Sequence, residues 1–397
     1  MNAKRAVLIM LLLLVSCGKS SKNPTAPPAD PAAVVVSMNP SDHPDFLCDG
    51  VADDIEINLA IQSADSASNW TVLLKPGTYH VQHGIIVTSR VTLRGSGPNT
   101  VIRLDDNAPG MQAAAGIVRI KDDTQRGVLK RVHHVTVEDL VVDGNRAYQA
   151  PGTGEKKFGL YAEGDFLTFR RLIARDCAGY GFDPHEHPDS IASTNVLIED
   201  CESSGNAADG FVLDHVMNAT VRRSYAHDND RHGFNLVTKT NAVTLSDNRA
   251  LRNGATGLMA QNGTHDVVIQ SCELGENALQ GMSLRDADGC SLLGNTFRAN
   301  RRSGLLLRLS DHTTVSGNSF AESDTGSIGR SVVTLDSAFV NLLSANTVSS
   351  TKAREGVLEA GTSDYNQVMN NVFSGPTQPV VLIGPHSTQS GNQIHVP

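Results

Sequence analysis

The 397-residue sequence predicts an all-β fold, a single parallel β-helix of short stacked strands closed at its N-terminal end by a capping α-helix. Three observations predict it. A block of 23 or 24 residues repeats along the second half of the chain. Within each block, apolar and polar residues alternate as in half-buried strands. The composition agrees, because Gly is abundant (35 residues) and aromatic residues make up only 5% of the chain.

An asparagine marks each repeat. These asparagines are Asn206, Asn229, Asn253, Asn277 and Asn300. Apolar residues come ten and eight positions before each of them, and a Gly-apolar pair follows shortly after. The alternating apolar positions mark the interior, whereas Asn and Gly mark turns with unusual backbone angles. A leucine-rich repeat has a similar period, but its Leu-x-x-Leu-x-Leu pattern is missing, so the β-helix is favoured.

Three segments are expected along the chain. Residues 1–16 have the features of a secretory signal peptide, with two basic residues and an apolar run too short to span a bilayer. Residues 17–42 are rich in Ser, Pro and Ala, which predicts a flexible tether. Residues 43–397 are expected to form the β-helix. Within them, residues 53–67 have helical spacing with acids in the first turn, which predicts the cap.

Charge and cysteine content exclude two classes of protein. The chain carries 42 acidic and 33 basic residues and a net charge of −9, which argues against a nucleic-acid partner. Five cysteines follow Cys17, without tight spacing: Cys48, Cys177, Cys201, Cys272 and Cys290. We therefore expect buried thiols that pack as small hydrophobic groups rather than a disulfide framework.

The repeat assigns side chains to faces. Counting from each glycine of a Gly-apolar pair, the next residue points inward, so Phe182, Phe211 and Phe234 should stack in the interior. The residues two and four steps after the glycine point outward, which places Asp183 and His185 on the outer face. Neighbouring coils lie about 4.8 Å apart. His185 should therefore lie directly beside Asp214 of the next coil.

This outer face has the residues of an acid–base site. Tyr180 precedes the strand that carries Asp183 and His185. A carboxylate beside His185 favours the imidazolium, and crowding of Asp183 and Asp214 favours one protonated acid. Coupled groups of this kind are typical of acid–base catalysis, although a solvated strand face would be the non-catalytic alternative. Further polar and basic residues follow along the face: Arg231, His232, Asn235, Arg285 and Arg308.

The longer motifs closely resemble those of the catalytic A-modules of secreted bacterial mannuronan C5-epimerases. They are Asp143-Gly-Asn-Arg146, Tyr180-Gly-Phe-Asp-Pro-His-Glu186, Asp209-Gly-Phe-Val-Leu-Asp214, Asn229-Asp-Arg-His-Gly-Phe-Asn235 and Gly384-Pro-His-Ser-Thr388. The resemblance covers roughly Asp45 to Gly391. It implies a right-handed parallel β-helix that acts on alginate. Residues at the family's catalytic positions are Tyr180, Asp183, His185 and Asp214, and residues that match its substrate groove are Arg231, His232 and Asn235.

The resemblance implies conversion of β-D-mannuronate to α-L-guluronate within the polymer. We expect His185 to remove the C5 proton, Tyr180 to return one from the opposite face, and the two aspartates to neutralise the sugar carboxylate; the roles of His185 and Tyr180 could be exchanged. Because alginate is a polyanion, Arg285 and Arg308 should provide a basic track, with Lys156 or Lys157 on the other side. An alginate lyase using the same residues, or a non-catalytic polysaccharide-binding β-helix, remain alternatives.

Cofactor, assembly and location are further expectations. Calcium is a candidate cofactor by resemblance, but no site is assigned, because the family's Gly-Asp-Gly opening is here Cys48-Asp49-Gly50 and its nine-residue calcium-binding repeats are absent. No organic cofactor is expected, and we expect a monomer.

The segment Leu14-Val15-Ser16-Cys17 resembles the lipobox of bacterial lipoproteins. It implies an outer-membrane lipoprotein of a Gram-negative bacterium, lipidated on Cys17 and either periplasmic or surface-exposed.

Overall fold

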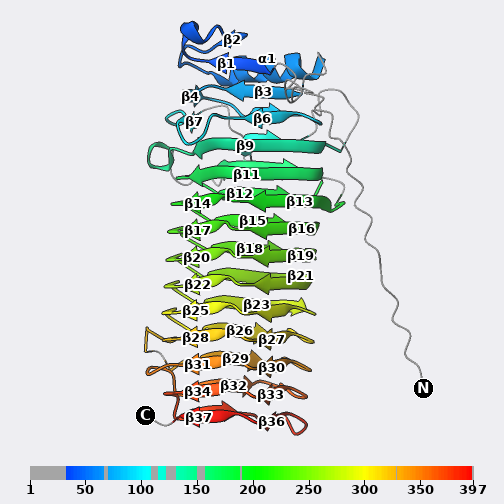
Figure 1. The fold of residues 1–397 in the computed structure, drawn as a ribbon, viewed down its shortest axis with the longest axis vertical. Coiled ribbons are helices and arrows are strands. Elements are labelled where there is room, and N and C mark those ends of the chain that lie inside the picture. Colours follow the sequence, from blue (N-terminus) through cyan, green and yellow to red (C-terminus); the bar gives the residue numbers. More distant parts are fainter. Residues whose placement is uncertain are drawn as a thin grey trace, which may run out of the picture.

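In a computed structural model the chain forms a parallel β-solenoid of about 12 turns, which confirms the predicted fold class (Figure 1). The structure describes residues 33–66, 70–108, 115–121, 131–149, 157–187, 190–327 and 329–395. The predicted signal peptide, Cys17 and Lys156 lie outside the described residues. Among those that are described, no helix is long and apolar enough to cross a bilayer.

The strands stack as three parallel ladders that run along the solenoid. The first ladder consists of β5 (Ile85–Val87), β8 (Ala115–Ile120), β10 (Lys157–Glu163), β12 (Phe182–His185), β15 (Phe211–Asp214), β18 (Phe234–Val237), the first part of β21 (Leu258–Gln270), β23 (Met282–Asp288), β26 (Leu305–Arg308), β29 (Val333–Asp336), β32 (Glu355–Ala360) and β35 (Gln378–Val381).

The second ladder follows the first along each coil. It consists of β1 (Val34–Ser37), β3 (Thr71–Leu74), β6 (Thr92–Arg94), the first parts of β9 (His133–Asp143) and β11 (Asp165–Arg175), β13 (Ser193–Glu199), β16 (Val216–Arg222), β19 (Asn241–Ser246), the second part of β21, β24 (Ser291–Leu293), β27 (Thr314–Ser316), β30 (Leu342–Ser344), β33 (Gln367–Met369) and β36 (Thr388–Ser390). Strand β2 (Phe46–Leu47) pairs with β1.

The third ladder completes each coil. It consists of β4 (Gly77–Val81), β7 (Thr100–Leu104), the second parts of β9 and β11, β14 (Glu202–Ser204), β17 (Tyr225–His227), β20 (Arg249–Leu251), β22 (Glu273–Gly275), β25 (Thr296–Arg298), β28 (Ser319–Ala321), β31 (Thr347–Ser349), β34 (Val372–Ser374) and β37 (Gln393–His395).

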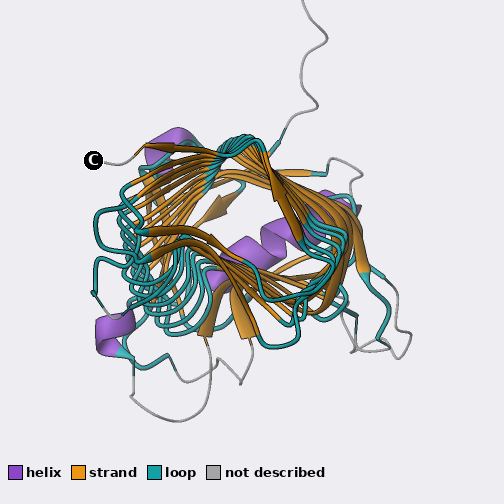
Figure 2. Ribbon diagram, turned by 90° about the horizontal axis from the view of Figure 1, so that it is seen from below, coloured by secondary structure: helices purple, strands orange, loops and turns teal. Residues whose placement is uncertain are grey.

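A helix covers the N-terminal opening of the solenoid (Figure 2). Helix α1 (Asp54–Ser66) contacts β1, β3 and β5 and buries four apolar residues at helical spacing, Ile57, Ala60, Ile61 and Ala64. Asp53 lies just before it and accepts hydrogen bonds from the amides of Gly50 (2.9 Å) and His80 (2.7 Å). The predicted cap is thus confirmed. The described residues include the short 3-10 helices η1 (Pro40–Asp42) and η3 (Arg146–Tyr148).

The solenoid begins inside the segment predicted as tether. Strand β1 pairs with β2 and β3, and Val36 is completely buried. Only the short alternation of Val34 and Val36 signals this strand, and the Pro-rich stretch before it dominates the composition. The β-helix therefore starts at Val34 rather than at residue 43.

The aromatic stack predicted from the repeat lies in the interior. The Phe182 and Phe211 ring centroids are 4.7 Å apart, those of Phe211 and Phe234 are 4.9 Å apart, and all three side chains are fully buried. Stacked aromatic pairs add stabilisation beyond the area that they bury. All five described cysteines are also buried and unpaired, as expected.

Asparagine ladders run through the turns. The Asn253 side-chain oxygen accepts the backbone N–H (3.3 Å) and the side-chain N–H (3.0 Å) of Asn229 in the preceding coil. Asn277 does the same for Asn253, and Asn300 for Asn277. These turn amides are out of reach of water, so the asparagines supply the partners that buried polar groups require.

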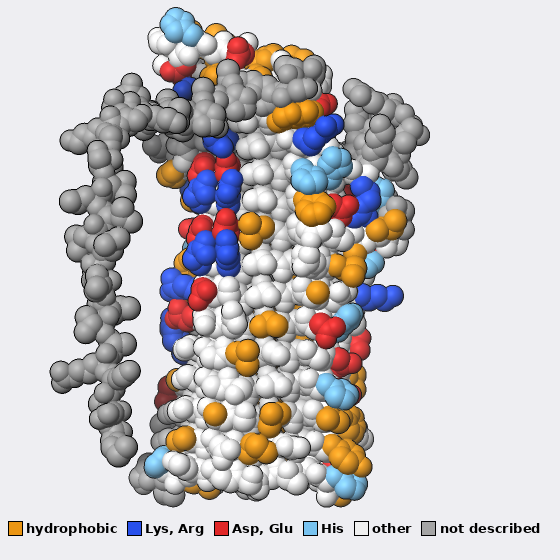
Figure 3. Space-filling model, turned by 45° about the vertical axis from the view of Figure 1, so that its right-hand side comes forward, with side chains coloured by type: hydrophobic (Ala, Val, Ile, Leu, Met, Phe, Trp, Pro, Cys, Tyr) orange, Lys and Arg blue, Asp and Glu red, His pale blue; other side chains and the backbone are white. Residues whose placement is uncertain are grey.

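Columns of ion pairs line part of the outer surface (Figure 3). Glu138 on β9 is almost fully buried and pairs with Arg94 (2.6 Å) and Arg170 (2.5 Å). Burial acts to raise the pKa of Glu138, but the two guanidinium groups outweigh it and the pKa is lowered. Asp143 pairs in the same way with Arg103 and Arg175, and Glu199 pairs with Arg222, so the ion pairs of these columns link neighbouring coils.

The asparagine ladder predicts a large stability difference between buried and exposed asparagines. Asn253→Ala should lower the free energy of unfolding by about 1–3 kcal/mol for each buried group left without a partner. Asn241→Ala is the control. Asn241 bonds the Lys239 carbonyl at the surface, so its loss should stay within about 0.5 kcal/mol. Urea unfolding of both variants checks this, and equal losses would contradict a structural role for the ladder.

Candidate active site

The outer face of the first ladder brings the predicted acid–base residues together. On β12, Asp183 and His185 alternate with the buried Phe182 and Pro184. The Nδ1 atom of His185 lies 3.5 Å from Oδ2 of Asp214 and 3.8 Å from Oδ1 of Asp183. Asp214 lies at the end of β15 in the next coil, so the coil register predicted this contact correctly.

Tyr180 lies in the turn before β12. Its ring stacks on Phe158 of β10, with centroids 4.9 Å apart and ring planes 22° from parallel. Its carbonyl accepts the amide N–H of Gly159 at 2.9 Å. Both contacts are to the preceding coil, so this coil fixes the orientation of a half-buried tyrosine at the start of the site strand.

Burial and crowding shift the protonation of the site. Burial raises the pKa of Asp183, and the negative charges of Asp214 and Asp209 raise it further, against an opposing contribution from His185. Burial acts to lower the pKa of His185, but Asp183, Asp214 and Glu163 outweigh it, so this pKa is raised. Asp183 therefore keeps its proton to higher pH than an ordinary aspartate, and His185 favours the imidazolium.

Two atoms at the centre of the site lack hydrogen bonds. Among the described residues, Oδ1 of Asp183 and Nδ1 of His185 are buried and have no hydrogen-bond partner. Their 3.8 Å separation is too long for one, so their interaction is electrostatic. Buried polar groups are usually bonded, and exceptions occur at functional sites.

Asp209 organises the next part of the face. Its carboxylate is fully buried and accepts the backbone N–H of His232 (2.9 Å) and the side-chain N–H of Asn235 (2.8 Å), with Nε of Arg231 at 3.7 Å. Asp209 was not among the predicted site residues. Its signal in the sequence is its place just before Gly210, the place that Tyr180 and His232 have before their own glycines.

His232 differs from His185 in charge state. Burial lowers the pKa of His232, and the positive charges of Arg231 and Arg285 lower it further, against the opposing charge of Asp209. Its Nδ1 accepts the backbone N–H of Thr256 at 3.2 Å. His232 is thus neutral near pH 7, whereas His185 is held towards the charged form.

Two of the predicted basic residues lie next to each other on the first ladder. Arg285 on β23 and Arg308 on β26 are register partners, and Arg308 lies 3.5 Å from Asp336.

Lys157 is only 7% exposed, and its ammonium donates to Gln149 (2.9 Å) and to the Ala108 carbonyl (3.2 Å). The expectation that Lys157 offers an exposed charge is therefore corrected: β10 begins here, and its first side chain is turned into these buried contacts.

Two site-face residues on β10 were not predicted. Tyr161 is the register partner of Asp183, and Glu163 that of His185. The Tyr161 hydroxyl donates to Oε1 of Glu163, and its ring centroid lies 5.6 Å from that of His185. Gly159 and Leu160 form the same Gly-apolar pair as Gly181 and Phe182, which is the signal that could have found them; the irregular repeats upstream hid it.

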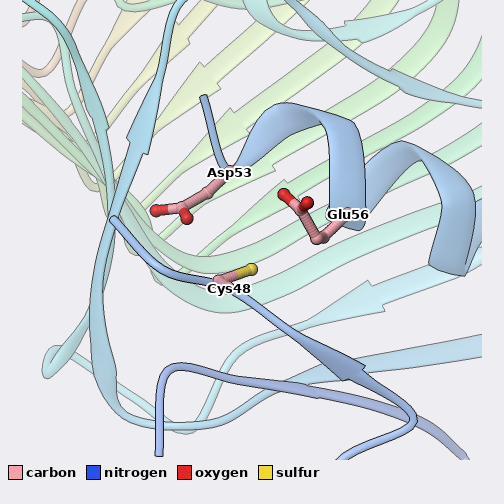
Figure 4. Close-up of side chains that lie close together, drawn as sticks. All are labelled: Cys48, Asp53 and Glu56. Atoms are coloured by element: carbon pink, nitrogen blue, oxygen red, sulfur yellow. The ribbon is translucent and has the colours of Figure 1, made fainter. Parts of the chain in front are cut away.

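A group of possible metal ligands lies at the cap, away from this site (Figure 4). The ligand atoms of Cys48, Asp53 and Glu56 lie within 4.8 Å of one another. Calcium prefers oxygen ligands, and both Asp53 oxygens already accept backbone N–H groups. Burial and the neighbouring acids raise the pKa of the Cys48 thiol, which keeps it protonated. This group therefore does not fit the calcium ion that the resemblance suggests.

Comparison with known proteins places the chain. It matches the family model described as right handed beta helix region over residues 158–328 and again over residues 236–395. The chain belongs to the right-handed β-helix family. Its coils are therefore right-handed, as the resemblance to epimerase A-modules implies.

Proteins that resemble the chain include alginate-modifying enzymes. Mannuronan C5-epimerase AlgE5 of Azotobacter vinelandii is 34% identical over 266 residues, which cover 62% of the chain and 25% of the relative. The A-module of the epimerase AlgE6 from the same organism superposes with a TM-score of 0.81 at 27% identity, covering 89% of the chain and 98% of the module. Alginate lyase 7, also of Azotobacter vinelandii, is 32% identical over 209 residues, 49% of the chain and 23% of the lyase.

The match concerns one module of larger proteins. The chain spans a quarter or less of the length of the first curated epimerases that it matches. Sequence and structure together match the epimerase A-modules.

The two buried aspartates should respond differently to replacement by asparagine. Because the folded-state pKa of Asp183 is raised, its ionisation destabilises the fold as the pH rises above about 4. Asp183→Asn should therefore gain stability relative to wild type between mildly acidic and neutral pH. Asp209→Asn should lose stability at neutral pH, since an amide oxygen cannot replace both acceptors. Urea unfolding at two pH values tests both predictions. If Asp183→Asn loses stability relative to wild type as the pH rises, the raised pKa of Asp183 is refuted.

Proposed function

We propose that the protein is a mannuronan C5-epimerase that converts β-D-mannuronate into α-L-guluronate within alginate. The observation that carries the proposal is the position of His185 between Asp183 and Asp214, with Tyr180 at the start of the same strand. The similarity to epimerase A-modules supports it. The substrate class follows from the names of these relatives.

Inversion at C5 needs three chemical contributions. The proton lies next to a carboxylate, so that carboxylate must be neutralised before the proton becomes acidic enough to leave. Asp183 suits this role because burial raises its pKa and so favours the protonated acid, and Asp214 assists. We assign removal of the C5 proton to His185 and its return on the other face to the Tyr180 hydroxyl, with exchange of these two roles as the alternative. As a base, His185 must first lose its own proton, so turnover should rise with pH.

The remaining residues of the face are assigned to binding. Arg231, Arg285 and Arg308 would meet the carboxylates of the polymer, and His232 and Asn235 its hydroxyl groups. Calcium dependence stays part of the proposal without an assigned site. We also propose that Cys17 is lipidated and tethers the protein, as a monomer, to the outer membrane.

An alginate lyase is the second candidate. Alginate lyase 7 is similar to about half of the chain. Elimination begins with the same C5 proton, but the carbanion then expels the 4-linked sugar instead of being reprotonated. The residues on the face serve both reactions, so the products decide between them.

Incubation of the purified protein with polymannuronate tests the proposal. Proton NMR reports new guluronate residues, and ultraviolet absorbance reports unsaturated chain ends. We expect guluronate without unsaturated ends. Unsaturated ends would favour the lyase, and no change under either measurement, with and without added calcium, would favour a binding protein.

Tyr180→Phe tests the proposed acid. The phenyl ring keeps its stacking on Phe158, so the fold should be intact, but turnover should fall about 100-fold or more because no proton is donated. Tyr225→Phe is the matched control, since Tyr225 lies on β17 in the third ladder and bonds Arg252 there. The measurement is initial rate on polymannuronate for both variants. Near-normal turnover of Tyr180→Phe would refute the role of this hydroxyl.

A further inference from the structure

Glu163 places a buried acid beside the site histidine. It ends β10, where it is the register partner of His185 on β12, and it is 2% exposed. Parallel neighbours in register lie about 4.8 Å apart and point to the same face. Glu163 therefore adds a third carboxylate to the two aspartates that approach His185.

Hydrogen bonds and cations satisfy this carboxylate only in part. Its Oε1 accepts the Tyr161 hydroxyl, and Nζ of Lys121 lies 3.6 Å from the same atom. Its Oε2 is buried and has no hydrogen-bond partner in the described structure. The Glu138 carboxylate, in contrast, lies between Arg94 and Arg170. The negative charge of Glu163 is thus less compensated than that of an acid in the structural columns.

Tyr161 links Glu163 to His185. Its ring centroid lies 5.6 Å from that of His185, with the planes 36° apart, and its hydroxyl is committed to Glu163. Burial, this hydrogen bond and the nearby negative charges raise the pKa of Tyr161, so the phenol stays neutral. Tyr161 therefore fixes the Glu163 carboxylate in place without cancelling its charge.

The groups that face His185 are mostly acidic. They are Asp183 on its own strand, Asp214 on β15, Tyr161 and Glu163 on β10, Glu186 and its partner His215 next to the strand ends, and, one coil further, Arg119 and Lys121. The two cations lie beyond β10, so Glu163 is between them and the imidazole. Among the acids of this group, Glu163 is the one that neither adjoins His185 in sequence nor follows from the epimerase motifs.

We propose that Glu163 is a positioning residue of this site, whose buried charge stabilises the protonated ring of His185 and so sets the pH at which His185 exchanges its proton. The inference rests on the proposed function for its catalytic consequence, but not for the titration itself. Opposite charges at this separation favour the charged form of histidine. The charge of Glu163 is among the causes of the raised pKa of His185.

Titration of His185 by NMR tests the proposal without any substrate. Histidine-labelled full-length protein is compared with Glu163→Gln, and His185→Gln assigns the signal. Removal of the charge should move the His185 midpoint to lower pH. Glu163→Asp keeps the charge and should stay nearer to wild type, which separates charge from shape. Glu276→Gln is the matched control, because Glu276 lies in the exposed turn after β22, where it pairs with Arg298 of β25, and its replacement should leave the His185 midpoint unchanged.

The rate profile gives the catalytic readout. The rise of kcat/KM with pH, which reports the free enzyme, should begin at lower pH in Glu163→Gln than in wild type. If wild type has no activity on polymannuronate while the NMR midpoint still moves, the proposed function fails and the inference holds. An unchanged His185 midpoint in a folded Glu163→Gln protein overturns the inference, whatever the activity. If Glu163→Gln does not fold, Glu163→Ala takes its place, and a lowered His185 midpoint in that variant supports the inference whereas an unchanged one overturns it.

Discussion

The rest of the structure depends on the in-register stacking of one coil on the next. Each strand pairs with the strand one repeat later, so a residue at a given step lies above the residue at the same step of the following coil. This register places Phe211 on Phe234 and Asn229 on Asn253. Because asparagine recurs at the same step, the buried amides of these asparagines find partners in the next coil.

The same stacking builds the candidate site. A fixed distance of about 4.8 Å between coils leaves acidic residues at the same step no room to separate. Burial lowers the pKa of His185, but Asp183 on its own strand and Asp214 and Glu163 on the neighbouring coils outweigh this effect and raise it. Burial, with the charges of Asp214 and Asp209, raises the pKa of Asp183. The solenoid thus creates a coupled site by repetition of its coils.

Acidic clusters on this surface fall into two kinds. In the columns across β9, β11, β13 and β16, each acid lies against an arginine, as Glu199 does against Arg222, and the pKa of Glu199 is lowered mainly by that hydrogen bond. At the site, the cation nearest to Asp183 is a histidine, and buried oxygens stay without partners. The two kinds differ in how far a neighbouring positive charge compensates the negative charge of the acid. This difference separates acids that support the fold from acids that can exchange protons.

The sequence by itself determined the coil, the cap and the central site pair, because a period of 23 or 24 residues and a strand period of two fix which side chains share a face. That was enough to place His185 beside Asp214 and to stack Phe182 on Phe211. It was not enough where repeats become irregular: Tyr161 and Glu163 joined the site only through the pairing of β10 with β12. Burial, too, was decided by the tertiary structure alone, since only the packed surroundings show that Lys157 is enclosed and that Glu163 keeps an uncompensated charge.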